Sequence, residues 1–450
     1  MSALWFEAAL VGDDWADRVR MQMADGVISA ITTGVDPAPG DERHRIGLPG
    51  LPNLHSHGFQ RGMAGLAEQR GATSDDFWSW RDVMYRFLDR LGPEDVEAIA
   101  ALAYVEMLEA GFTRVGEFHY LHHDADGQPY ADPAEMAARI VAAAEASGIG
   151  LTLLPVFYAH GGFGGAAAGA AQRRFLSNVD SYARLVEASR AAGAILPDAV
   201  VGIAPHSLRA ATPGEIRTIL PLAADGPVHI HIAEQRKEVA DCLAWSGRRP
   251  VEWLLGEMPV DDRWCLVHAT HVTEAERATL ARSGVVAGLC PITEANLGDG
   301  IFPAAAYLAD GGAFGIGSDS NVLISASEEL RLLEYGQRLS RHERCVLADT
   351  RPSVGATLFT GALAGGSRAL GVAGGIAIGH AADLVSLDAD DPSLVARSGD
   401  RLLDSWIFAS RAGIDCVWRR GVRLVEGGRH IKSDETRRRF SAVLTRLIGG

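Results

Sequence analysis

The middle of the chain repeats one pattern eight times, and this repetition constrains the fold more than any other feature. A short apolar run rich in β-branched residues ends in polar or ionisable residues, and a stretch with helical periodicity follows. The eight runs span residues 46–57, 114–120, 150–160, 199–207, 228–234, 264–270, 285–291 and 314–320. Near-continuous apolar runs are typical of parallel strands buried on both faces. The alternation therefore predicts an α/β fold, a TIM-like (β/α)8 barrel.

A doubly wound open sheet is the alternative fold for the same alternation. The barrel is favoured because no glycine-rich phosphate loop follows the first apolar run. The helical stretches carry their own boundary signals. Residues 273–284 begin with Thr273 as an N-cap, have Glu274 and Glu276 in the first turn, and end at Gly284.

The two ends of the chain differ from its middle, because both hold short strand-like runs separated by turns. Segments of this kind on either side of a barrel are most simply paired with each other. We therefore expect a small β-sandwich domain composed of residues 1–48 and 376–430 around a barrel of residues 49–375. A C-terminal helix is predicted over 431–450, capped by Ser433 or Asp434.

Composition limits the partners of the chain. Of its 450 residues 47% are hydrophobic and 22% charged, and no apolar run reaches the roughly 18–20 residues of a membrane span. The net charge of −15 argues against nucleic acid as the main partner, since phosphate binding needs clustered Lys and Arg. Five scattered cysteines without a CxxC motif, and an N-terminus unlike a signal peptide, predict a cytoplasmic protein with reduced thiols.

Ionisable side chains gather at the predicted strand ends, where barrels of this kind carry their chemistry. In the first run His55 and His57 lie two residues apart, so a strand aims both imidazoles to one side. An isolated HxH pair is also compatible with an ordinary polar strand end. Later runs add His119, Tyr120, His160, His206, His231, Glu234, His268 and Asp319. Three histidines and an aspartate from different strands can surround one Zn²⁺ or Fe²⁺ and leave a position for water.

Other histidines in the same region are interpreted as structural. His119, His122 and His123 form a cluster without carboxylates at ligand spacing, so we assign it to a loop. His229 alternates with His231 and is expected to face away from the metal. Cys290 is expected to pack in the barrel, since no base is implied beside it.

The ordered set of His55-x-His57, His231-x-x-Glu234, His268 and Asp319 resembles the amidohydrolase superfamily over nearly the whole chain. The fourth run ends in APHSLR, without the bridging lysine of binuclear members, so the chain resembles the mononuclear deaminase branch. The resemblance implies that His55, His57, His231 and Asp319 bind one divalent metal, Zn²⁺ with Fe²⁺ as the alternative. It also implies that His268 lies beside this metal and that the protein is a homodimer.

The chemistry of such a site is that of hydrolysis. A divalent ion brings the pKa of bound water from 15.7 to about 7, which supplies a nucleophile at neutral pH. Asp319 can take a proton from that water and pass it to the leaving nitrogen. Glu234 can protonate an imine-like nitrogen, so that the adjacent carbon accepts attack.

Two stretches, NLHSHGFQRGMAGLAE with DDFWSWRDVMYRFLDRLGPED and LCPITEANLGDGIFPAAAYLADGGAFGIGSDSN, resemble one group within this branch. Its members release ammonia from the formimino group of N-formimidoyl-L-glutamate. A dicarboxylate needs guanidinium groups, for which Arg81 and Arg209 are the candidates. Tyr120 and His206 are expected to bond the other polar oxygens, and Gln60 with Glu234 to hold the formimino N–H groups.

Less specific interpretations of these residues stay open. An arginine after a strand is often a solvated charge, and Tyr120 can serve packing alone. A nucleobase-type or triazine aminohydrolase of the same superfamily is the alternative function. A metal-free barrel that only binds a ligand is the third hypothesis, and the complete set of metal ligands weighs against it.

Overall fold

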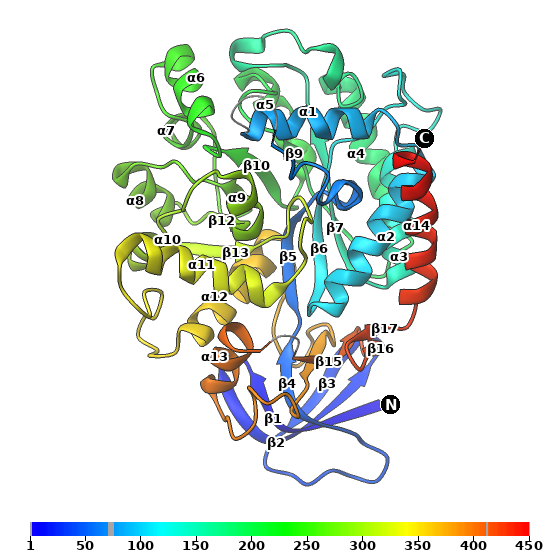
Figure 1. Cartoon of the computed structure of the whole chain (residues 1–450), viewed down its shortest axis with the longest axis vertical. Coiled ribbons are helices and arrows are strands. Elements are labelled where there is room, and N and C mark those ends of the chain that lie inside the picture. The colour runs from blue at the N-terminus through cyan, green and yellow to red at the C-terminus, as the bar shows by residue number, and fades with distance from the viewer. Residues whose placement is uncertain (1, 71–75, 411–412, 450) are drawn as a thin grey trace.

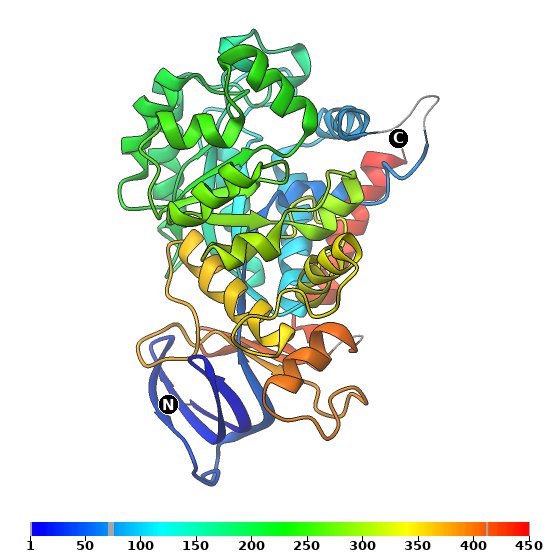
Figure 2. The ribbon, with the colours of Figure 1, turned by 90° about the vertical axis from the view of Figure 1, so that its left-hand side faces the viewer.

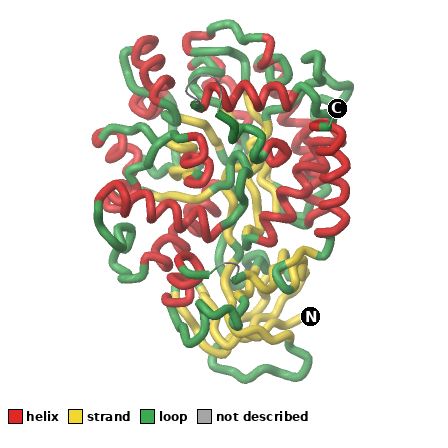
Figure 3. Tube along the Cα trace, viewed as in Figure 1, coloured by secondary structure: helices red, strands yellow, loops and turns green. Residues whose placement is uncertain are grey.

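The computed structural model describes residues 2–70, 76–410 and 413–449. A barrel of parallel strands surrounded by helices forms the upper part of the molecule, and a mostly antiparallel sheet lies below it (Figures 1 and 3). The barrel strands are β5 (Leu51–Ser56), β6 (Phe112–His119), β7 (Gly150–Phe157), β8 (Val200–Val201), β9 (Ala204–Pro205), β10 (Val228–Ile232), β11 (Trp264–His268), β12 (Val286–Leu289) and β13 (Ala313–Ile316).

Two parallel sheets make up the barrel wall. One holds β5 to β9 and the other β10 to β13, and parallel bridges join them at both seams, from Ile203 to Val228 and from Ser56 to Asp319. The predicted barrel is confirmed. Two of the predicted strands are interrupted in the structure. Residues 46–57 divide at Gly50 into β4 and β5, and residues 199–207 form only the short β8 and β9. Glycine at the first break lets the backbone approach β6, because a Cβ at Gly50 would lie 2.2 Å from Thr113 Cγ2.

Helices cover the outside of the barrel (Figure 2). They are α1 (Phe77–Leu88), α2 (Pro93–Glu109), α3 (Glu135–Ser147), α4 (Val179–Gly193), α5 (Pro213–Ile219), α6 (Arg236–Ser246), α7 (Pro250–Glu257), α8 (Glu274–Arg282), α9 (Pro291–Leu297), α10 (Ala304–Ala309), α11 (Ala326–Arg341), α12 (Val354–Ala369), α13 (Asp400–Phe408) and α14 (Ser433–Ile448), with short 3-10 turns η1 (Gly58–Met63), η2 (Phe163–Gly165), η3 (Ala170–Gln172) and η4 (Leu220–Ala223). Among the described residues no helix is both long and apolar enough to cross a membrane.

Helix boundaries test the capping signals. The Thr273 side chain accepts the amide of Glu276 at the start of α8, as predicted. The predicted cap of the last helix was wrong, because α14 begins at Ser433 itself and Lys432 before it makes no side-chain cap. The Ser433 hydroxyl instead accepts a hydrogen bond from Arg437 Nε, 3.0 Å away.

Both ends of the chain build the lower sheet, as expected. Its strands are β1 (Ser2–Val11), β2 (Asp14–Ala24), β3 (Val27–Thr32), β4 (Glu42–Pro49), β14 (Leu384–Leu387), β15 (Ile414–Arg419), β16 (Val422–Glu426) and β17 (Arg429–His430), in the order β17-β16-β15-β14-β4-β1-β2-β3. Phe6, Met21, Ile28, Leu384 and Trp418 are part of its own apolar core. The limits of the domains as independent units stay a prediction.

Close packing along the barrel axis sets the position of the strand ends. The Leu54 side chain fills the interior, and it has room because Gly288 and Gly315 face it: a Cβ at either would lie 3.0 Å and 2.4 Å from its methyl groups. A Cβ at Gly317 would lie 2.8 Å from the backbone oxygen of His55. Glycine at that point lets the end of β13 approach the end of β5.

Candidate metal centre and substrate pocket

Four predicted ligands converge at the mouth of the barrel. His55 lies near the end of β5 and His57 directly after it, His231 lies on β10, and Asp319 follows β13. The Nε2 atoms of His55 and His231 lie 3.0 Å apart. Asp319 Oδ1 lies 3.5 Å from His55 Nε2 and 3.3 Å from His57 Nε2. All four residues are at most 5% exposed, so the structure brings the predicted set together inside the protein.

In two of the predicted ligands, His57 and His231, the Nδ1 atom is already used in a hydrogen bond. His57 Nδ1 donates to the carbonyl of Phe118 at 2.8 Å, and His231 Nδ1 donates to the carbonyl of His206 at 3.2 Å. Such bonds fix the tautomer that leaves the Nε2 lone pair free for a metal. Burial lowers the pKa of His55 to about 3 and also lowers the pKa of His57 and His231, so the rings are neutral. Neutral imidazoles around a carboxylate are a donor set that fits Zn²⁺ or Fe²⁺.

Asp319 is held through its backbone, by the neighbouring backbone and by the side chain of Asn321. Its amide donates to the carbonyl of His55 and its carbonyl accepts the amide of His57, both at 2.9 Å. Asn321 Nδ2 donates to the carbonyls of His57 and Asp319 at 3.1 and 3.0 Å. Asp319 and His268 have φ values of 45° and 69°, a left-handed conformation that non-glycine residues rarely adopt. The two strand ends are therefore tied together at the metal side.

His268 lies among carboxylates. Its Nδ1 is 3.2 Å from Glu294 Oε1, and its Nε2 is 3.9 Å from both Glu234 Oε1 and Asp319 Oδ2. Burial by itself would lower the pKa of His268, but Glu234, Glu294 and Asp319 outweigh it and raise the pKa to about 10. Burial raises the pKa of Glu234 as well. A proton is therefore held in the space between His268 and Glu234, next to Asp319.

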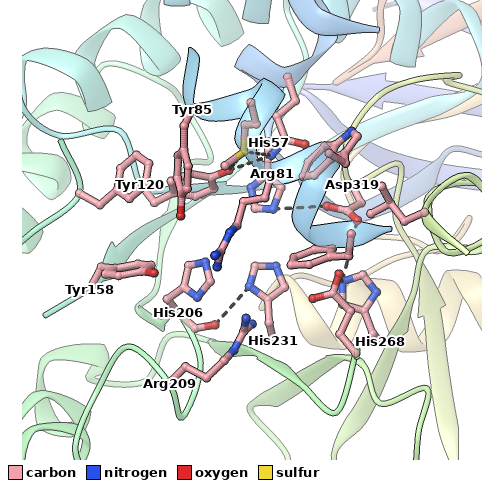
Figure 4. A pocket seen from close by; sticks show the side chains of 17 residues that line it. His57, Arg81, Tyr85, Tyr120, Tyr158, His206, Arg209, His231, His268 and Asp319 are labelled. Carbon is pink, nitrogen blue, oxygen red and sulfur yellow. Dashed lines mark hydrogen bonds and ion pairs between the residues drawn. The ribbon is translucent and has the colours of Figure 1, made fainter. Parts of the chain in front are cut away.

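The ligands form one end of a pocket, shown in Figure 4. His57, His231, Glu234, His268 and Asp319 line the metal end, and Tyr85, Tyr158, Phe175 and Trp80 line the walls. The predicted Gln60 and Tyr120 lie between them. Gln60 Nε2 donates to the hydroxyl of Tyr120 at 2.8 Å, while Gln60 Oε1 is buried and has no hydrogen-bond partner in the described part of the chain. An acceptor is thus available for an N–H group of a ligand.

Two arginines reach into the same pocket from different elements. Arg81 extends from α1, with its guanidinium carbon 4.4 Å from the ring centre of Trp78, and Arg209 follows β9. Figure 4 shows their guanidinium groups pointing into the cavity from opposite sides of His206. Among the described residues the Nε atoms of both are buried without a hydrogen-bond partner. These donors fit an anionic ligand.

The structure also separates the remaining histidines from the metal end. His122 and His123 bond the carbonyls of Val156 and Leu176 at 2.9 and 2.7 Å, and His229 Nε2 bonds the carbonyl of Ala369 at 2.7 Å. One ring nitrogen of each is used for loop or barrel packing, which agrees with the predictions for these three residues. The loop assignment was wrong for His119, which is the last residue of β6.

Some residues of the site were not found from the sequence. Glu294, which positions His268, lies in the TEANLGDG motif, four residues after Cys290. Asn321 lies in the GSDSN motif two residues after Asp319. A short polar side chain so close to a predicted ligand could have indicated a residue that holds the ligand in place. Tyr85 and Tyr158 gave no signal, because their roles depend on how α1 and the strand ends pack across the mouth.

The chain belongs to the amidohydrolase family, whose profile matches residues 46–424. Residues 1–45 match the N-terminal domain of formimidoylglutamate deiminase HutF. Over its full length the chain is 53% identical to formimidoylglutamate deiminase of Pseudomonas aeruginosa, with 100% of both chains covered. A 5-methylthioadenosine/S-adenosylhomocysteine deaminase of Natronomonas pharaonis is 29% identical, over 83% of this chain and 80% of that protein.

Solved structures show the same architecture. An amidohydrolase from Brucella melitensis superposes with a TM-score of 0.97 at 55% identity and covers all of both chains. A zinc-bound adenosine deaminase from Xanthomonas campestris superposes with a TM-score of 0.82 at 23% identity, over 100% of this chain and 98% of that one. This second likeness bears on the fold only.

Proposed function

We propose that the protein hydrolyses N-formimidoyl-L-glutamate to N-formyl-L-glutamate and ammonia, using one divalent metal held by His55, His57, His231 and Asp319. One observation carries the proposal: a single pocket has a metal-ligand set at one end and, at the other, two guanidinium groups whose Nε atoms have no hydrogen-bond partner among the described residues. The 53% identity to a formimidoylglutamate deiminase over the full length supports the same substrate. Zn²⁺ is the first choice of metal and Fe²⁺ the alternative, since the same donors bind both.

The metal end supplies the nucleophile. A divalent ion held there by His55, His57, His231 and Asp319 would make water a nucleophile at neutral pH. The neighbouring ligand histidines keep the pKa of Asp319 low despite burial, so its carboxyl is ionised. The carboxylate therefore accepts a proton from the attacking water. The same carboxyl then returns this proton to the departing nitrogen, which leaves as ammonia.

Glu234 and His268 act on the formimino group. Glu234 lies 3.9 Å from His268 and lines the pocket beside Asp319. Its carboxyl shares a proton with the formimino nitrogen, so that positive charge stays on the group under attack. His268, kept protonated by Glu294 and its other acidic neighbours, donates a hydrogen bond to the oxygen of the tetrahedral centre. Gln60 accepts an N–H bond and orients the group.

The arginine end sets the substrate class. Arg81 and Arg209 pair with the two carboxylates of the glutamate portion, in charge-assisted bonds that a neutral heterocycle cannot make. Tyr120 and His206 bond its remaining oxygens. Because the pocket is buried, these pairs are stronger than the same pairs in water.

The test is ammonia release by the purified protein loaded with Zn²⁺ or with Fe²⁺. N-Formimidoyl-L-glutamate is expected to be turned over, while guanine, adenosine and a triazine are not. Turnover of a heterocycle without turnover of the formimino compound would instead identify a nucleobase-type or triazine aminohydrolase. The formimino ester with both carboxylates blocked is the matched control, and it is expected to be a poor substrate.

We further infer a cytoplasmic homodimer. The described cysteines are all free, which is typical of a reducing compartment. The dimer is the state that the family resemblance implies, and light scattering on the eluted protein tests it: a mass near 96 kDa, twice the 47.8 kDa of one chain, is expected, and a monomer mass contradicts it.

A further inference from the structure

A second group of metal-ligand side chains lies in the lower sheet, at the opposite end of the molecule from the pocket (Figure 1). His44 is on β4, and Asp415 with Cys416 is on β15. A ring nitrogen, a carboxylate oxygen and the sulfur of these residues all lie within 4.8 Å of one another. In the sheet β14 separates β4 from β15, so the group joins two strands that are not hydrogen-bonded neighbours. It shares no residue with the catalytic pocket.

The orientation of His44 is fixed on two sides. Its ring packs edge-on against Trp418, with ring centres 4.7 Å apart. Its Nε2 lies 3.1 Å from Glu42 Oε1, within hydrogen-bonding distance, so a proton on Nε2 has an acceptor there. Its Nδ1 then presents a lone pair to Asp415 Oδ2, 3.6 Å away. A carboxylate behind a histidine, with the free nitrogen facing other ligands, is the usual arrangement of a metal-binding histidine.

Cys416 adds a sulfur ligand from the inside of the sheet. The residue is 3% exposed, and burial together with the neighbouring Asp415 raises the pKa of its thiol to about 11. A metal ion therefore binds with release of the thiol proton to solvent. The side chain of Asp415 is 38% exposed, which leaves a path for the ion and for a water ligand.

The charges around the group favour a cation. Glu42 and Asp415 face His44 from two strands. The cationic group that faces them is Arg423 on β16, which pairs with Glu42 at 2.9 Å and with Glu426 at 3.2 Å. Arg423 therefore offsets part of the charge of Glu42, and it also lies near enough to Cys416 for the two groups to interact electrostatically.

We propose that His44, Asp415 and Cys416 bind a second divalent metal ion, Zn²⁺ by the softness of the donors, with water as the fourth ligand. One nitrogen, one oxygen and one sulfur suit the tetrahedral preference of zinc. The ion connects β4, from the N-terminal part of the sheet, to β15, from the C-terminal part. The ion stabilises the sheet and takes no part in the hydrolysis.

Cobalt substitution gives the most direct test, because a thiolate ligand on Co²⁺ absorbs in the near ultraviolet. The full-length protein carrying Cys345→Ser is the background, since Cys345 is exposed and would bind metal unspecifically. Addition of Co²⁺ is expected to produce the thiolate band in this background and in a further Cys290→Ser variant. Cys416→Ser and His44→Gln are expected to abolish it. A band that persists in both of these variants overturns the proposal.

Metal content gives an independent readout. After dialysis against buffered free Zn²⁺, the unmodified protein is expected to hold one ion more per chain than Cys416→Ser and His44→Gln. His342→Asn, at an exposed histidine, is the matched control and keeps the extra ion. Ammonia release by the three variants is expected to stay within about twofold of the unmodified protein, because the group lies outside the pocket. Equal metal content in all four proteins contradicts the proposal.

Discussion

The two ends of the pocket are built in different ways. At the metal end each side chain comes from a strand end, and backbone bonds tie the ends of β5 and β13 together before any ligand arrives. At the arginine end, Arg81 comes from a helix laid across the mouth and Arg209 from the loop after β9. The first end is organised by the barrel itself. The second depends on packing outside it.

We therefore assign catalysis to the metal end and the choice of substrate to the arginine end. The metal end has the donors that we propose bind the metal, and its geometry leaves little freedom because Gly317 and Asn321 hold Asp319 in place. At the arginine end the Nε atoms of Arg81 and Arg209 have no hydrogen-bond partner among the described residues, and we propose that the substrate supplies it. We therefore expect substitutions at the metal end to abolish turnover of every substrate. Substitutions at the arginine end should affect carboxylate substrates alone.

The largest effect is expected from the ligands. His55→Ala or Asp319→Ala should lower kcat by more than about 10³-fold, because the nucleophile is lost with the metal. Ammonia release and bound metal are measured together, with circular dichroism as the control for folding. Near-normal activity in either variant refutes the ligand assignment.

Arg209→Met tests the opposite end. Loss of one charge-assisted pair to a carboxylate, worth about 1.5–3 kcal/mol, should lower kcat/KM for N-formimidoyl-L-glutamate by roughly 10- to 100-fold. The effect should lie mostly in KM, and metal content should stay unchanged. Arg81→Met is the matched variant on α1. A comparable fall for an uncharged formimino compound would show that the arginine positions the reacting group instead.

Asn321→Ala distinguishes a residue that positions a metal ligand from the ligand itself. The variant keeps all four ligands but removes the side chain that joins His57 and Asp319, so metal affinity should fall by about 10- to 100-fold. Competition with a chelator measures this affinity. Activity should return at high free Zn²⁺, whereas the Asp319→Ala variant should gain nothing. Unchanged affinity would mean that the backbone bonds are sufficient.

His122 distinguishes a structural histidine from a ligand. Burial lowers its pKa from 6.5 to about 4, so the folded state binds its proton less readily than the unfolded chain. Its contribution to the free energy of unfolding is fully present above pH 6.5 and is lost as pH falls toward 4, to a limit of about 3 kcal/mol. His122→Gln, which can still donate to Val156, should flatten this part of the stability profile. An unchanged profile in urea unfolding contradicts the assignment, and His342→Gln is the exposed control.

Much of this architecture could be predicted from the sequence, for a physical reason. Parallel strands expose their ends on one side of a barrel, so alternating apolar runs predicted both the fold and the edge where His231 and Asp319 meet. The division at Gly50 and the short fourth strand could not be found, because apolar pattern does not distinguish one long strand from two. The orientation of Arg81 depends on how α1 lies across the mouth. Glu294 acts only through its contact with His268, which needs three-dimensional packing.

Anomalous scattering from crystals grown with Zn²⁺ tests the central claim most directly. The account predicts a peak at the barrel mouth, about 2.0–2.2 Å from Nε2 of His55, His57 and His231 and from an oxygen of Asp319. A mouth without a peak, or a peak bound by other residues there, would contradict it.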